Sequence, residues 1–80
     1  MNVYHVTYYA ALREQRGLAE EQVQSPADTV QTLYTALRES HKLQWDLHDL
    51  KVAINNRMAR WTDTLTNGDH IAFLPPVSGG

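Results

Sequence analysis

Apolar and polar residues alternate along the stretch from Asn2 to Tyr9, which is rich in β-branched and aromatic side chains. Such alternation is typical of a strand with one buried face, because successive side chains of a strand point to opposite sides of a sheet. We therefore predict a strand here. The set expected to face the core is Tyr4, Val6 and Tyr8, and the opposite set is His5, Thr7 and Tyr9.

The next segment predicts a short helix and a second strand. Helix formers run from Ala11 to Arg16, and Gly17 can adopt the left-handed conformation that ends one or two helical turns. Leu18 to Gln24 has a polar residue at most alternate positions, and Ser25-Pro26 breaks the pattern. The two strands are expected to pair as a widened hairpin.

The clearest helical pattern begins after Asp28 or Thr29, either of which can cap it, with Gln31 placed for a capping-box role. Its apolar residues are spaced i, i+3, i+4, i+7 and form one stripe, which must pack against a sheet to be buried. They are Val30, Leu33, Tyr34 and Leu37. Polar residues then interrupt the period from Ser40 to Asp49, so a loop is expected there, with a helical turn anchored by Trp45 and Leu47.

The C-terminal half contains three short strand patterns. We predict strands at 51–55, 58–61 and 70–74, with turns at Asn56-Arg57 and Asn67-Gly68. Ile71 and Phe73 are expected in the core. The order strand, strand, helix, strand, short strand, strand is satisfied compactly by an α+β fold of the β-grasp (ubiquitin-like) type, a mixed sheet of about five strands with one main helix on one face.

Composition and charge exclude several classes of function. The 80 residues carry a net charge of -2 with scattered lysines and arginines, which argues against nucleic acid as a partner. Cysteine is absent, so thiolate metal sites and cysteine nucleophiles are excluded, and the four histidines have no metal-ligand spacing. We expect no metal and no cofactor on this chain. No targeting segment or membrane span is apparent, so a cytoplasmic location is expected.

The last eight residues, FLPPVSGG, form a distinct motif. Pro75 and Pro76 fix φ and favour an extended exit from the last strand, and the six residues that follow Leu74 can reach about 20 Å. Gly79 and Gly80 lack Cβ atoms, so the end of the chain is narrow enough to enter a confined pocket. Residues 1–74 are thus predicted to form the domain and 75–80 a tail whose only reactive group is its terminal carboxylate.

Three apolar side chains have no place under the single predicted helix. They are Tyr9, Met58 and Leu74. Either they are scattered surface residues, which are common, or they form a docking patch beside the base of the tail.

These motifs resemble the small subunits of molybdopterin synthase, a family of ubiquitin-like sulfur carriers. The similar segments are FLPPVSGG, TNGD, VAINN and YYAALREQRG, and the similarity spans essentially all 80 residues. The resemblance implies that the Gly80 carboxylate is adenylated by a ubiquitin-activating-type adenylyltransferase that uses ATP. A sulfur donor protein then converts it to a thiocarboxylate.

The resemblance also implies how such a tail is used. It would insert into the large subunit of the synthase, in an α2β2 assembly, and give its sulfur to a cyclic pyranopterin monophosphate precursor, forming the dithiolene of molybdopterin. The inserted residues would be Phe73, Leu74, Pro75, Pro76, Val77, Ser78 and Gly79. The catalytic side chains are expected on the large subunit, so the isolated chain would not be an enzyme.

Three alternatives remain open. The chain could carry sulfur for thiamine or cysteine synthesis. It could be a ubiquitin-like modifier conjugated to lysines through Gly80. It could also be a non-catalytic interaction module whose tail adds a strand to a partner.

Overall fold

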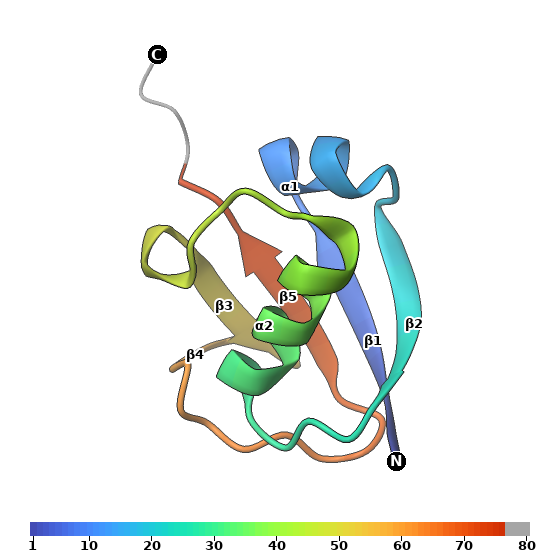
Figure 1. The fold of residues 1–80 in the computed structure, drawn as a ribbon. Helices are drawn as coiled ribbons and strands as arrows, with labels where there is room; N and C mark the ends of the chain where they lie inside the picture. Colours follow the sequence, from blue (N-terminus) through green and yellow to red (C-terminus); the bar gives the residue numbers. More distant parts are fainter. Residues whose placement is uncertain (77–80) are drawn as a thin grey trace.

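The computed structural model describes residues 1–76 of the chain. Its sheet has five strands in the order β2-β1-β5-β3-β4, with β1 and β5 parallel and the other neighbours antiparallel. The elements are β1 (Asn2–Tyr8), α1 (Ala10–Arg16), β2 (Glu20–Ser25), α2 (Val30–His41), a 3-10 helix (Leu47–Asp49), β3 (Lys51–Ile54), β4 (Arg57–Ala59) and β5 (His70–Leu74). Figure 1 shows α2 lying across one face of the sheet and α1 at one end of it. The predicted β-grasp fold is confirmed.

The core lies between α2 and the covered face of the sheet, on the residues that the alternation predicted. Tyr4, Val6 and Tyr8 of β1 are at most 1% exposed, and Ile71 and Phe73 of β5 are fully buried. The apolar stripe of α2 meets them through Val30, Leu33, Tyr34 and Leu37. Each large apolar side chain buried in this way contributes about 2 kcal/mol by removal from water, so this layer specifies which sheet face α2 covers.

The ends of the two helices follow local sequence signals. Gly17, at φ 80°, ends α1 and donates its N–H to the carbonyl of Arg13. The hydroxyl of Thr29 accepts a hydrogen bond from the N–H of Thr32 at 3.2 Å, so Thr29 caps α2. The alternative cap at Asp28 was therefore wrong, and so was the capping-box role of Gln31, because Thr32 occupies the third helical position.

Several strand boundaries differ from the prediction by one or two residues. The β3–β4 turn consists of Asn55 and Asn56, both at positive φ, rather than Asn56-Arg57. Two consecutive residues with positive φ are typical of the hairpin turns that match strand twist, and asparagine tolerates this conformation. As a result β4 begins at Arg57 and ends before Trp61, which packs against the core instead. β2 is likewise displaced to Glu20–Ser25.

Candidate functional site

The tail is attached to a central strand of the sheet. β5 lies between β1 and β3 and ends at Leu74, and the chain leaves the fold at the end where β1 also finishes (Figure 1). Phe73 is fully buried in an aromatic cluster, 5.0 Å from Tyr34 and stacked at 6.0 Å on Trp61, measured between ring centroids. β5 is paired with a strand on each side, and Phe73 is packed in the aromatic cluster, so the direction in which the chain leaves the sheet is fixed.

A groove lies beside the base of the tail. Its volume is about 640 Å³, and its lining is mostly apolar. Two residues of the predicted patch, Met58 and Leu74, line it together with Pro75 and Pro76. Met58 is 65% exposed, and Pro75 is buried. The structure therefore brings together two apolar side chains that lie 16 positions apart in the sequence, at the point where the tail begins.

The remaining residues that line this groove were missed by the sequence analysis. They are His48, Asp49, Leu50 and Lys51, from the 3-10 helix and the start of β3. The sequence pattern predicted only a loop at 40–49 and no functional role for it. Leu50 and Lys51 could have been found from topology, because Lys51 pairs with Leu74 in the β3–β5 ladder. His48 and Asp49 carry no such signal in the sequence.

Tyr9 lies on the same side of the sheet but outside the groove lining. It directly follows Tyr8, which pairs with Phe73, so Tyr9 and Leu74 are the next residues on two neighbouring parallel strands. Its backbone is still extended (φ -122°, ψ 152°), which continues the alternation away from the core. Tyr9 is 46% exposed. Whether these three residues dock a partner stays a prediction.

We call the sheet face opposite α2 the open face. By alternation it carries Val3, His5 and Thr7 of β1, Glu20, Gln22 and Gln24 of β2, Lys51 and Ala53 of β3, Met58 of β4, and His70, Ala72 and Leu74 of β5. Small residues cross its centre in one row, since Thr7 pairs with Ala72 and Ala72 with Ala53. These three side chains are partly exposed, in contrast to the buried residues behind them. The face is thus flat and partly apolar next to the tail.

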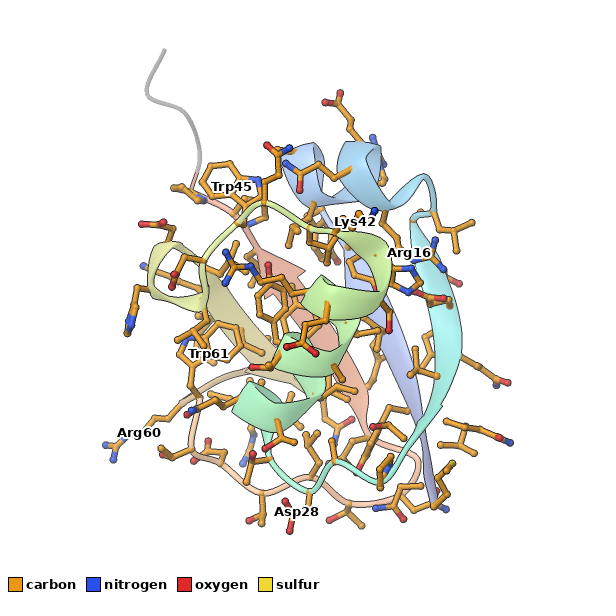
Figure 2. All side chains as sticks on the ribbon, in the orientation of Figure 1. Arg16, Asp28, Lys42, Trp45, Arg60 and Trp61 are labelled. Atoms are coloured by element: carbon orange, nitrogen blue, oxygen red, sulfur yellow. The ribbon has the colours of Figure 1, made fainter. Side chains whose placement is uncertain are left out.

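A charged clamp joins α1 and β2 to the end of β1, the strand next to β5. Arg16, the last residue of α1, donates to both carboxylate oxygens of Glu21 at 2.8 and 2.9 Å, and Tyr8 donates its hydroxyl to Glu21 at 2.7 Å. Figure 2 shows Arg16 between α1 and β2. Burial alone would raise the pKa of Glu21, but the hydrogen bonds from Arg16 and Tyr8 and the charge of Arg16 together outweigh it, so this pKa is lowered. Burial, followed by the bond to Glu21, raises the pKa of Tyr8.

Side-chain hydrogen bonds also hold the loop that precedes the groove. Tyr34 donates its hydroxyl to the carbonyl of Trp45 at 2.6 Å, and burial raises the pKa of Tyr34 to about 12. The N–H of Gln44 donates to the side-chain carbonyl of Gln15 in α1 at 2.9 Å. Figure 2 places Trp45 at the end of the molecule from which the tail leaves. The loop is therefore a fixed part of that end.

The predicted reactive residue, Gly80, and the last three residues of the predicted insertion segment, Val77, Ser78 and Gly79, lie outside the described residues. Within residues 1–76, no group of three or more histidine or acidic side chains could hold a metal ion. The helices in this part of the chain are too short or too polar to cross a membrane. The geometry of the described site suits binding of another protein beside the exit of the tail.

Comparisons with known proteins identify relatives along nearly the whole chain. The ThiS family matches residues 6–80. The molybdopterin synthase sulfur carrier subunit of Escherichia coli is 33% identical over 78 residues, covering 94% of this chain and 96% of the relative. Among solved structures, SAMP1 from Haloferax volcanii has a TM-score of 0.80 at 26% identity, covering 99% of this chain and all of that one. The complex of subunits 1 and 2 of the molybdopterin-converting factor from Helicobacter pylori matches with a TM-score of 0.68 at 24% identity, covering 98% of this chain and 99% of that one.

Proposed function

This chain belongs to the ThiS family, and from that membership we propose that it is the sulfur carrier subunit of molybdopterin synthase. The observation that supports this most strongly is the 33% identity to the E. coli sulfur carrier subunit over nearly the full length of both chains. The fold adds a physical reason. A tail rooted in a central, well-packed strand and flanked by a groove suits insertion into a partner.

The proposed chemistry takes place on the Gly80 carboxylate. One carboxylate oxygen attacks the α-phosphate of ATP on an activating enzyme of the ubiquitin-activating type, and pyrophosphate leaves. A sulfur nucleophile at the oxidation level of sulfide, delivered by a donor protein, then displaces AMP and leaves a thiocarboxylate. The absence of cysteine fits this route, since sulfur held at the terminal acyl group needs no side-chain thiol.

On the large subunit, the thiocarboxylate sulfur would attack a carbon of a cyclic pyranopterin monophosphate, forming a carbon–sulfur bond as the carbon–oxygen bond at that carbon breaks and the displaced oxygen keeps the electron pair. Water then releases the Gly80 acyl group as a carboxylate, and the sulfur stays on the precursor. A dithiolene has two sulfur atoms, so the carrier must leave and be charged again between the two transfers.

The charged form can be detected directly. The chain purified from its native cell should contain a fraction in which one oxygen is replaced by sulfur, seen as a mass increase in the intact protein. Oxidation of Met1 or Met58 gives nearly the same increase, so the gain must persist in a Met58→Leu variant and vanish when Gly80 is deleted. Because the chain has no cysteine, iodoacetamide at neutral pH should label the thiocarboxylate much faster than any other group. Unmodified carboxylate alone, in cells that are making the cofactor, would count against the proposal.

A modifier function is the second candidate, and the similarity to SAMP1 favours it, because that protein is a small archaeal modifier. It begins with the same adenylation but ends in an isopeptide bond. Conjugates of Gly80 with lysines of other proteins, in cells where no thiocarboxylate is found, would establish it instead. A thiocarboxylate that accumulates in cells lacking the large subunit and is used for thiamine or cysteine would assign the carrier to another pathway.

The docking surface can be tested with a matched pair of variants. Leu74→Asp places a charge at the groove and should weaken binding to the large subunit about ten-fold or more, since burial of an unpaired charge costs over 1.4 kcal/mol. Leu18→Asp is the control, because Leu18 is 40% exposed and lines a separate depression beside α1. Both variants should stay folded. If Leu74→Asp unfolds the protein, the assignment of Leu74 to the uncovered face of the sheet is wrong. If the two variants bind equally well, the groove is not the docking surface.

A further inference from the structure

Two histidines lie side by side on the open face. His5 of β1 and His70 of β5 are paired in the parallel ladder, and their ring centroids are 4.6 Å apart with the planes tilted by 44°. They are 65 positions apart in the sequence, so only the parallel pairing of these strands brings them together. Neither belongs to the groove beside the tail.

The chain itself offers this pair little compensating charge. His5 Nε2 is 3.6 Å from Glu20 Oε1, and the Glu20 side chain is 62% exposed. His70 Nε2 lies 2.7 Å from the hydroxyl of Thr7, which is neutral. The carboxylate of Asp69, next to His70 in the chain, accepts hydrogen bonds from Asn55 Nδ2 at 3.0 Å and from the N–H of Thr66 at 2.8 Å. Gln22, opposite His5 on β2, is uncharged.

Charge is distributed unevenly over the molecule. The chain has nine acidic residues and a net charge of -2, yet Glu20 is the only acidic residue among the open-face positions named above. Lys51 balances Glu20 on this face. Protonation of both imidazoles would therefore give the face two net positive charges, while the rest of the chain stays acidic. Such a surface complements a partner with carboxylates.

We propose that the His5–His70 pair docks against an acidic segment of the large subunit. The pair lies where β5 begins, at the other end of this strand from the groove. This rests on the proposed function, because the partner is the protein that receives the tail. Carboxylates facing the pair favour the imidazolium forms, so complex formation takes up protons. Since histidine is the side chain that titrates between pH 5 and 8, the affinity rises as the pH falls through that range.

Calorimetric titration of the full-length chain with the large subunit at about pH 6 and about pH 8 tests this. We expect the dissociation constant to be about ten-fold lower at the acidic pH, which corresponds to an average uptake of about half a proton for each complex formed. In the double variant His5→Gln, His70→Gln the ratio should fall below about two-fold. His41→Gln, at the end of α2 and away from the open face, should keep the wild-type ratio. Circular dichroism at both pH values checks that each variant is folded.

Glu20→Gln gives an independent readout. It removes the one acidic side chain that shares the open face with the pair, so binding to an acidic segment should become tighter at both pH values. An unchanged pH ratio in the double variant, or weaker binding by Glu20→Gln, would overturn the inference while leaving the sulfur carrier function intact. Failure to form any complex at either pH would overturn both.

Discussion

Replacing Glu21 by glutamine, which has nearly the same shape but no charge, should destabilise the fold by about 2 kcal/mol at pH 7. The side chains of Arg16 and Glu21 are only 21% and 16% exposed, and the pair is bidentate. Exposed ion pairs contribute about 0–1 kcal/mol, whereas breaking a fully buried pair costs about 3–5 kcal/mol. The clamp lies between these limits. Tyr8 can still donate to the amide oxygen, so the loss falls mainly on Arg16.

The effect should depend on pH in a defined direction. The pKa of Glu21 is lowered in the folded protein, so the clamp stabilises the fold fully above the pKa of an unfolded glutamate, about 4.3, and this contribution is lost as the pH falls through the folded value. The difference between wild type and Glu21→Gln should therefore be largest near pH 7 and shrink progressively as the pH falls below about 4.

Urea unfolding followed by tryptophan fluorescence measures this difference, because Trp45 and Trp61 both pack against the core. The thermal midpoint should fall by about 10 °C for a chain of this size. Glu20→Gln is the matched control. Glu20 precedes Glu21 in β2 and is exposed on the opposite face of the sheet, so its replacement should change the free energy of unfolding by less than about 0.5 kcal/mol. A Glu21→Gln variant as stable as wild type at pH 7, or a deficit that persists undiminished in acid, would refute this reasoning.

Two further predictions concern backbone strain and alkaline pH. Lys42 ends α2 at φ 55°, so Lys42→Gly should stabilise the fold by about 0.5 kcal/mol in thermal unfolding. The opposite change, Gly17→Ala at φ 80°, should cost about 1 kcal/mol from strain alone, because an added Cβ would meet nothing within 4 Å. Burial raises the pKa of Tyr34 to about 12, so the stability it contributes is complete below the unfolded value of about 10 and is lost as the pH rises toward 12. Tyrosinate absorbance of Tyr34 should thus appear together with unfolding, and ionisation of all four tyrosines in a folded chain would contradict this.

Local signals were enough to predict the elements and the buried faces of β1, α2 and β5. The alternation in β1 and the i, i+3, i+4, i+7 stripe of α2 are properties of neighbouring residues, so Tyr4, Val6, Leu33 and Tyr34 could be assigned to the core from the sequence. The short β3–β4 hairpin was displaced by one residue. Four alternating residues specify register weakly, and the two-residue turn at Asn55 and Asn56, both at positive φ, fixes it.

The surfaces that matter for binding needed the tertiary structure. The order β5-β3-β4 brings Met58 to Leu74 and adds His48 to the same groove, and the parallel pairing of β1 with β5 brings His5 to His70. No local pattern encodes these contacts, because they depend on which strands become neighbours once α2 has covered one face. The sequence by itself determined the elements, the buried faces of β1, α2 and β5, and a chain without a thiol that ends in two glycines. Packing of the sheet decided which side chains surround the base of that tail, since long-range pairing alone places distant residues on one surface.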